Sequence, residues 1–261
     1  MNNSNLIPSI SGCLISLNPL PLDFIYYLFT ICNEVSINFS KQPSKDYTDK
    51  LYQSWGKKIK ISINPFHNFA EARNISIEKS TGEWIFVLDT DEKLSEQLKK
   101  KIPELVKNPN YDVYCFKRIH FVNDPPPIND YWNHLRLFKR KCRYFGTIHE
   151  QVVNYSNKIV VNEAGCYILH DNYREDEYHK GIQRLAQLKE DIQKAKKLGN
   201  NDLIRYFQYK AWVQENIYLK EYDRKMTQTD FKQLYERYEE KSKEIEDLDN
   251  KIVKGEISMS L

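Results

Sequence analysis

Residues 81–92 read Thr81-Gly82-Glu83-Trp84-Ile85-Phe86-Val87-Leu88-Asp89-Thr90-Asp91-Glu92, and they give the clearest indication of the fold. The five residues from Trp84 to Leu88 are apolar without a break, which is typical of a strand buried on both faces of a sheet. Three acidic residues follow within the next four positions. In open α/β sheets ligands bind beyond the carboxyl ends of the strands, so this acidic run lies where chemistry is expected.

The residues before this stretch alternate short apolar runs with helical ones, the pattern of an α/β sheet. Strands are predicted at 10–17 and 58–63, and the end of a helix at 49–55. Asn68 followed three residues later by Glu71 is a capping-box arrangement and predicts the start of a helix. Gly82 follows the end of that helix, directly before the buried strand.

The last third of the chain has a helical period from about Asp176 onward. The first predicted helix carries apolar residues at three- and four-residue spacing and stops at Gly199. These apolar residues are Ile182, Leu185, Leu188, Ile192, Ala195 and Leu198. Further helices are predicted through 203–211 and 231–238. Residues 241–254 are rich in alternating charge and offer little apolar surface, so fraying is expected there. The predicted domains are 1–173 and a helical extension, 174–261, built as a repeat-like hairpin.

Composition excludes some classes of partner and compartment. The chain has 261 residues with 39 basic and 36 acidic side chains, and a net charge of +3 gives no reason to expect nucleic acid. The five cysteines form no Cys-x-x-Cys pair, which favours a reducing compartment over a disulfide framework. Neither a signal peptide nor a membrane span is predicted, so a cytoplasmic location is expected.

One basic run leaves a peripheral membrane contact open. Lys139, Arg140, Lys141 and Arg143 could face an anionic lipid or a phosphorylated acceptor, and a solvated turn between strands explains them equally well. The oligomeric state cannot be read from the sequence.

Asp89 and Asp91 are candidate metal ligands. Two carboxylates separated by one residue can present oxygen ligands to a hard divalent cation, Mg²⁺ or Mn²⁺. Such a cation neutralises a diphosphate and acts as a Lewis acid on the charge that develops when the diphosphate leaves. The alternative is that the acidic run merely opens a surface loop before a helix near Ser95. The Asp-x-Asp pair alone does not decide between the two.

The motifs around this pair resemble the family 2 glycosyltransferases of the GT-A fold. Residues 69–74, Phe-Ala-Glu-Ala-Arg-Asn, followed by residues 81–92 are similar to that family's Ala-Arg-Asn helix and its Gly-acid-Trp strand ending in an Asp-x-Asp-Glu cluster. A second block, residues 135–140 and 145–150, resembles the acceptor-side segment of the branch that modifies lipopolysaccharide cores or peptides. The resemblance covers roughly residues 10–173. It implies a mixed, mostly parallel sheet flanked by helices, with a C-terminal helical extension.

The resemblance also implies site residues. Asp89 and Asp91 would bind the metal and the nucleotide sugar. Arg73 suits a phosphate, because its planar fork pairs two oxygens, and Asn74 could reach the ribose or the sugar. A late histidine in this fold often approaches the metal or pyrophosphate, so His170 is a candidate third ligand; a backbone-bonded histidine at a strand end is the alternative.

Glu150, with His149 beside it, is the preferred candidate for the base. An inverting transfer needs a carboxylate or imidazole within hydrogen-bond reach of the acceptor hydroxyl or thiol. Asp91 and Glu92 remain alternatives for this role, and His149 with Glu150 could instead form a structural pair at a strand end.

The sequence departs from the family at the nucleobase contact. Family members carry an acidic residue closing the second strand, whereas residues 36–40 contain none, so the donor nucleotide is left open. The predicted function is a divalent-cation-dependent inverting glycosyltransferase. It would use a nucleotide-diphosphate sugar and a glycan, lipid-linked or peptide acceptor. The alternatives are a sugar nucleotidyltransferase, disfavoured because no Gly-rich phosphate loop follows the first strand, and a degenerate GT-A-like binding module.

Overall fold

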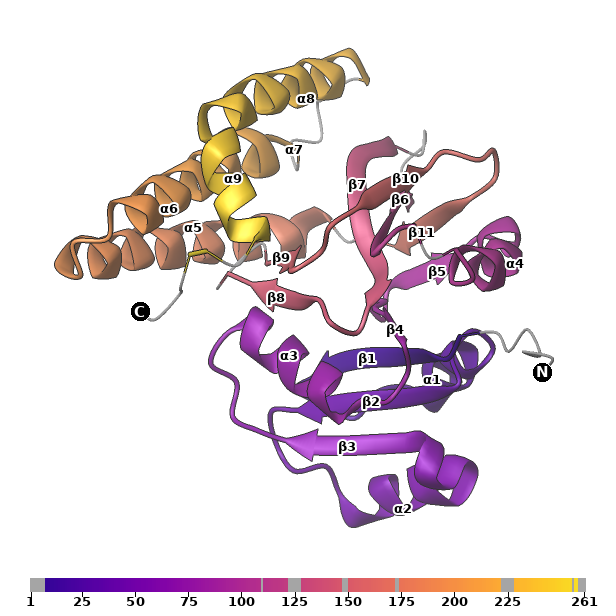
Figure 1. The fold of residues 1–261 in the computed structure, drawn as a ribbon. Coiled ribbons are helices and arrows are strands. Elements are labelled where there is room, and N and C mark those ends of the chain that lie inside the picture. The colour runs from indigo at the N-terminus through magenta and orange to yellow at the C-terminus, as the bar shows by residue number, and fades with distance from the viewer. Residues whose placement is uncertain are drawn as a thin grey trace. The chain divides into compact units, whose positions relative to one another are not determined.

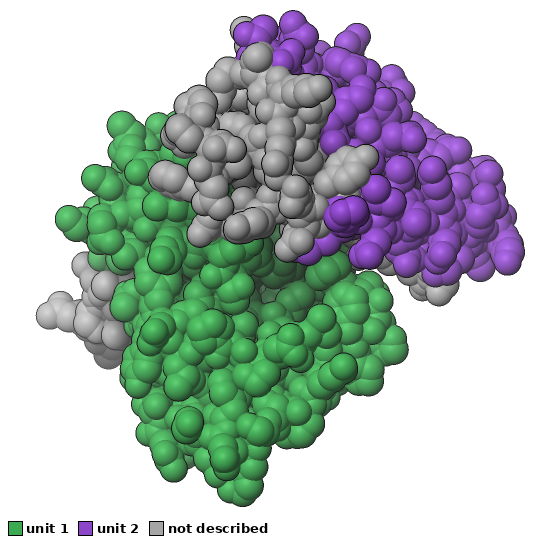
Figure 2. Space-filling view, turned by 180° about the vertical axis from the view of Figure 1, so that it is seen from behind, with its two compact units in different colours: residues 1–119, 132–170 green, residues 120–131, 171–261 purple. Residues whose placement is uncertain are grey.

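The computed structural model describes residues 8–108, 110–121, 128–146, 150–171, 174–221, 228–254 and 256–257. The chain divides into two compact units, residues 1–119 with 132–170 and residues 120–131 with 171–261 (Figure 2). The second unit takes in the helices and begins its main part at residue 171, and the predicted domains, 1–173 and 174–261, stay a prediction.

A nine-stranded sheet forms the frame of the fold, in the order β3-β2-β1-β4-β7-β6-β11-β5, with β10 paired to β6 (Figure 1). Its strands are β1 (Ile10–Ser16), β2 (Glu34–Phe39), β3 (Ile59–Ile63), β4 (Trp84–Phe86), β5 (Glu92–Leu94), β6 (Val113–Phe121), β7 (Ile128–Lys139), β10 (Lys158–Val161) and β11 (Tyr167–Asp171). A separate hairpin pairs β8 (Arg143–Phe145) with β9 (Gln151–Val153).

The strand directions confirm the predicted mixed, mostly parallel sheet. β1 runs parallel to β2 and β4, β2 to β3, and β6 to β10. β4 pairs antiparallel with β7, and β5 with β11. The carboxyl ends of β1, β2, β3 and β4 therefore share one edge of the sheet, and the acidic residues follow β4 at that edge.

Short helices link these strands, and side-chain caps explain where three of them begin. The helices are α1 (Leu22–Phe29), α2 (Lys45–Trp55), the one-turn η1 (Gly56–Lys58), α3 (Phe69–Lys79) and α4 (Glu96–Leu105). Ser44, Asn68 and Ser95 each accept a hydrogen bond from a backbone N–H in the first turn of α2, α3 and α4. Asn68 Oδ1 lies 2.8 Å from the Glu71 nitrogen, so the predicted start of α3 is confirmed.

The apolar run from Trp84 to Leu88 is buried on both faces, as predicted. Trp84, Phe86 and Leu88 belong to one apolar cluster, and Ile85 and Val87 belong to a second one. This alternation follows from the two-residue period of a strand. The hydrogen bond from the Val87 nitrogen to the Arg136 carbonyl, 2.9 Å, extends the pairing with β7 beyond the end of β4.

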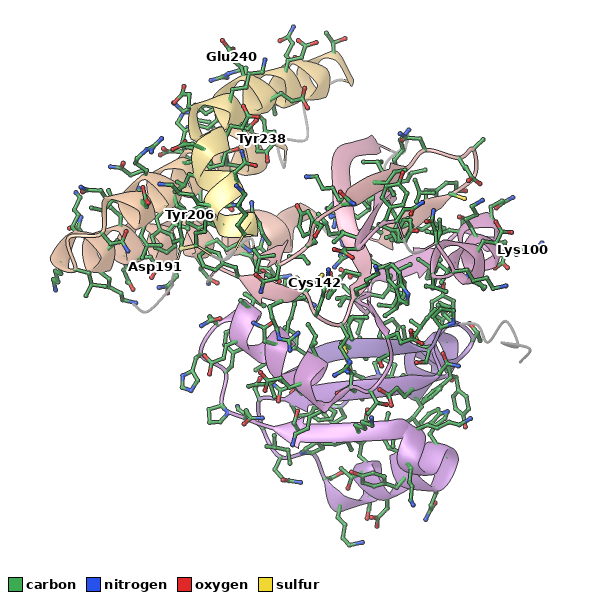
Figure 3. All side chains as sticks on the ribbon, in the orientation of Figure 1. Lys100, Cys142, Asp191, Tyr206, Tyr238 and Glu240 are labelled. Carbon is green, nitrogen blue, oxygen red and sulfur yellow. The ribbon has the colours of Figure 1, made fainter. Side chains whose placement is uncertain are left out.

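All five cysteines are buried free thiols. Cys142, labelled in Figure 3, belongs to the same apolar cluster as Phe138 and Tyr144. Burial raises the pKa of the Cys13 and Cys142 thiols to about 12, so both are protonated at neutral pH. The thiols therefore serve as small apolar side chains.

Glu34 ties together the amino-terminal ends of the strands, opposite the acidic turn. Its carboxylate accepts hydrogen bonds from Ser11 Oγ at 2.6 Å and Thr81 Oγ1 at 2.7 Å, and it pairs with Lys60 Nζ at 2.7 Å. Burial alone would raise the pKa of Glu34, but these partners outweigh it and lower the pKa to about 2. Three strands and the turn before β4 are thus held by one ionised side chain.

The second unit is mainly helical, as predicted for the extension. Its elements are α5 (Arg174–Lys197), α6 (Asn201–Val213), the π-turn η2 (Gln214–Tyr218), α7 (Leu219–Glu221), α8 (Gln228–Ser242), η3 (Lys243–Ile245) and α9 (Glu246–Val253). Gly199 has φ 65° and follows the end of α5, which confirms the predicted stop. Asp191 of α5 and Tyr206 of α6, both labelled in Figure 3, are almost fully buried.

The charge-rich segment at 241–254 differs from the expectation. It forms η3 and α9, and Ile245, Leu248 and Ile252 are buried there. Their spacing of three and four residues places them on one face of a helix. A few apolar residues are therefore enough to give this charged segment a buried face. Within the described residues, no helix has both the length and the hydrophobicity that crossing a membrane would require.

Candidate active site

The acidic turn between β4 and β5 is closed by its own hydrogen bonds. The Glu92 nitrogen donates to the Asp89 carbonyl at 3.0 Å, and the Asp89 nitrogen donates to Glu92 Oε2 at 3.2 Å. On the other side, β5 pairs with β11 so that Glu92 lies opposite His170. These contacts hold Asp89 and Asp91 at the carboxyl end of β4.

Two arginines bind the carboxylate of Asp89. Arg73 from α3 reaches Oδ1 at 3.4 Å, and Arg136 from β7 reaches Oδ2 at 2.8 Å. Burial opposes ionisation of this group, but the two guanidinium groups outweigh it and hold the pKa of Asp89 well below its usual range. The Asp89 side chain is 42% exposed, so it stays open to a ligand while both its oxygens have arginine partners.

Glu92 is 0% exposed, unlike its two acidic neighbours. Its Oε1 pairs with Arg136 Nη2 at 2.5 Å and with Arg118 Nη1 at 3.4 Å. A buried carboxylate is stable only when paired in this way. Glu92 is therefore a buried counter-ion and is shielded from an incoming acceptor.

Arg73 links the acidic turn to the predicted base. Its Nε donates to Glu150 Oε1 at 2.7 Å, and the guanidinium carbon lies 5.4 Å from the centre of the Tyr144 ring. The structure thus brings Arg73, Asp89 and Glu150 together, although 77 residues separate Arg73 from Glu150. His149, the other half of the predicted pair, lies outside the described residues.

Asn74 has backbone partners on β8. Its Nδ2 donates to the Tyr144 carbonyl at 2.9 Å, and its Oδ1 accepts from the Tyr144 nitrogen at 2.8 Å. Both ends of the amide are occupied, so the side chain anchors the hairpin to α3. These two bonds use one of the two N–H groups and one of the two oxygen lone pairs, and contact with ribose or sugar stays a prediction.

Asp91 and His170 lie side by side. Asp91 Oδ2 is 3.2 Å from His170 Nε2, and the Asp91 side chain is 47% exposed. A carboxylate oxygen and an imidazole nitrogen at this distance can share one cation, and Mn²⁺ accepts both donor types.

Asp91 and His170 fit the predicted cation, because they offer it one carboxylate oxygen and one imidazole nitrogen. The described residues contain no cluster of three or more histidine, cysteine or acidic side chains arranged to hold a metal. The diphosphate of a substrate is a natural source of further oxygen ligands. Asp89 fits less well, because both of its oxygens have arginine partners.

Sequence reasoning did not assign a role to Arg136 or Arg118. The sequence did contain a signal for Arg136. It is a charged residue with Leu135 before it and Leu137 and Phe138 after it, in a segment whose apolar residues indicate burial. A charged residue at a buried strand position requires a carboxylate partner, but the pattern does not say which carboxylate that is.

The basic run is partly neutralised within the chain. Lys139 Nζ and Lys141 Nζ bind the two oxygens of Asp112 at 2.9 Å and 2.7 Å. Arg143 donates to the carbonyls of Arg140 and Cys142. These contacts support the interpretation of this run as a turn between strands.

The mixed sheet, with helices on its flanks and carboxylates at the end of a buried strand, defines the class as α/β with the GT-A architecture, which confirms the predicted fold class. Residues 35–162 match the model of the family "Glycosyl transferase family 2". The match begins in β2 and ends just after β10. It includes Arg73, Asp89, Asp91, Arg136 and Glu150, and it leaves out His170.

Two curated proteins are similar to part of this chain. The SPbeta prophage-derived glycosyltransferase SunS of Bacillus subtilis (strain 168) is 31% identical over 128 residues, which cover 46% of this chain and 29% of that protein. Glycosyltransferase SunS of Bacillus phage SPbeta matches with the same figures. The match thus spans less than a third of the length of these curated relatives.

A solved structure of S. aureus TarS 1-349 in complex with UDP-GlcNAc superposes with a TM-score of 0.46 at 10% identity, covering 78% of this chain and 73% of that one. The same protein in complex with UDP gives a TM-score of 0.46, with 78% and 72% covered.

Proposed function

We propose that this chain is an inverting glycosyltransferase that moves a sugar from a nucleotide-diphosphate sugar to an acceptor hydroxyl or thiol with the help of a divalent cation. The observation that carries the proposal is the acidic turn after β4, where Asp91 lies 3.2 Å from His170 and Asp89 is held by two arginines. This turn lies within the segment that matches the glycosyltransferase family model.

The residues have distinct roles in the proposed reaction. Asp91 and His170 would hold Mn²⁺ or Mg²⁺, and the cation would neutralise the diphosphate as it leaves. Arg73 would supply fixed positive charge beside the diphosphate, because a charge already in place needs no reorganisation during the reaction. Asp89, which stays ionised, would orient both arginines.

We assign the base to Glu150, with Asp91 as the alternative. Deprotonation of the acceptor requires a carboxylate that the acceptor can reach. Glu92 is fully buried against Arg136 and is left out for that reason. The acceptor class is proposed from the sequence motifs alone, through their resemblance to the branch that modifies lipopolysaccharide cores or peptides.

Calorimetric titration tests the central claim. The purified protein is titrated with UDP, GDP, dTDP and their common sugars, first with Mn²⁺ and then with a chelator. We expect binding of one nucleotide that weakens in chelator. Asp91→Asn should weaken Mn²⁺-dependent binding by about tenfold or more, the loss expected for one charge-assisted contact.

Asp49→Asn is the matched control, because Asp49 is an exposed aspartate on α2 whose carboxylate binds Lys45 at 2.5 Å. It should leave nucleotide binding unchanged. If Asp91→Asn binds the nucleotide as the wild type does, the cation lies elsewhere. A folded wild-type protein that binds none of these nucleotides would make the degenerate binding module the better account.

A further inference from the structure

Arg136 is a buried cation beside the acidic turn. Its side chain is 9% exposed, and it projects from β7 next to Leu137, a fully buried residue of the core. One nitrogen, Nη2, serves two carboxylates, Asp89 at 2.8 Å and Glu92 at 2.5 Å. Among the described residues, the buried Nε atom of Arg136 has no hydrogen-bond partner.

Packing alone does not explain this residue. A buried charge has a large desolvation cost, and an unsatisfied buried N–H adds to it. An apolar side chain of similar volume, together with neutral partners, would avoid both costs. An unsatisfied buried group of this kind requires an explanation, and a functional role is one.

The contacts of Arg136 form a closed loop around Asp91. Arg136 joins the side chains of Asp89 and Glu92. The same two residues are also joined by the bond from the Glu92 nitrogen to the Asp89 carbonyl and by the bond from the Asp89 nitrogen to Glu92 Oε2. Asp91 lies between them in sequence and takes no part in these bonds. The position of the Asp91 carboxylate therefore depends on a turn whose two ends, Asp89 and Glu92, are both bound by Arg136.

We propose that Arg136 is a positioning residue: by binding Asp89 and Glu92 at once it fixes the turn that aims Asp91 at the cation. Arg136 itself binds no cation in this arrangement, since it is a permanently charged donor. The inference rests on the proposed function for the identity of the ligand, but the fixing of the turn is a property of the protein alone.

The first experiment needs neither metal nor nucleotide. Amide hydrogen exchange is measured across residues 88–94 in the wild type, Arg136→Gln and Arg136→Lys. The amides of Asp89 and Glu92 should exchange at least about tenfold faster in Arg136→Gln, because their acceptors are no longer held in place. Arg136→Lys should lie between the two, since an ammonium keeps the charge but lacks the planar fork.

The second experiment measures Mn²⁺ binding in the presence of UDP or GDP by electron paramagnetic resonance. Arg136→Gln should bind Mn²⁺ about tenfold or more weakly than the wild type, although no ligand atom has been removed. Lys139→Gln is the matched control: Lys139 lies on the same strand and pairs with Asp112, outside the acidic turn. It should match the wild type in both experiments.

Two results for Arg136→Gln would overturn the proposal. The first is amide hydrogen exchange across residues 88–94 at the wild-type rate. The second is faster exchange there with the Mn²⁺ affinity of the wild type. If Arg136→Gln does not fold, Arg136→Lys carries both tests, because it leaves a positive charge beside the two carboxylates. A wild-type protein that binds neither Mn²⁺ nor nucleotide refutes the proposed function and the cation-aiming role together, whereas the exchange result still reports on the turn.

Discussion

Glu150 occupies two roles that a single residue change can separate. Its carboxylate binds Arg73 at 2.7 Å, and it is also the proposed base. Glu150→Gln keeps the size of the side chain and an oxygen that can accept the Arg73 N–H, but it cannot take a proton. We expect kcat to fall by about a hundredfold or more, as for loss of a general base, with donor affinity within a few-fold of the wild type.

The opposite pattern would reassign the residue. If Glu150 only balances the charge of Arg73, its neutralisation changes donor affinity and leaves kcat at saturating donor nearly unchanged. Steady-state rates over a range of donor concentrations separate the two cases. Glu83→Gln, at an exposed glutamate before β4, controls for the loss of one negative charge.

Gly82 shows how one element depends on the close approach of another. A Cβ atom added at Gly82 would lie 2.8 Å from the Ser11 backbone nitrogen and 2.4 Å from Ser11 Oγ. β1 must therefore move for β4 to start here with any larger residue. Gly82→Ala should lower the free energy of unfolding by about 1–3 kcal/mol or more, in the range of overpacked cores.

Gly199→Ala provides the comparison. A Cβ added at Gly199 would have no atom within 4 Å, so the substitution there tests only the cost of a positive φ. Its cost should be about 1 kcal/mol, the ordinary penalty of a side chain at positive φ. Urea unfolding measures both. A loss at Gly82 no larger than that at Gly199 would mean that β1 and β4 can separate without cost.

The elements that carry strong local signals could be predicted from the sequence. The run from Trp84 to Leu88, the cap at Asn68 and the stop at Gly199 each follow from a short pattern, and all three are present in the structure. The acidic turn could be located for the same reason, because it directly follows the buried strand.

The network around that turn could not be predicted in the same way. It is made by β7 and α3, and β4 pairs with β7 through residues 51 to 55 positions apart, for example Phe86 with Leu137, so the pairing depends on tertiary packing. The same holds for Glu34, whose partners Ser11, Lys60 and Thr81 come from separate elements. Periodicity reports which face of an element is buried, but it does not report which charged partners meet there.

Glu34 makes the stability of the whole molecule depend on pH. Its folded-state pKa is about 2, whereas an unfolded glutamate has a pKa of about 4.3. A lowered folded-state pKa adds stability that is fully present above the unfolded value and is lost as the pH falls through the folded one. With the side chain only 12% exposed, the difference of roughly two units corresponds to about 3 kcal/mol above pH 5.

Glu34→Gln isolates this contribution from that of other acidic groups such as Asp89 and Asp112. The variant should be less stable than the wild type by about 3 kcal/mol at pH 7, because the amide cannot pair with Lys60 as a charge. The gap should close between pH 5 and pH 2, since protonated Glu34 also lacks that charge. Urea unfolding followed by tryptophan fluorescence at several pH values measures it. A gap that stays constant down to pH 2 would show that Glu34 acts through its shape and hydrogen bonds and not through its ionisation.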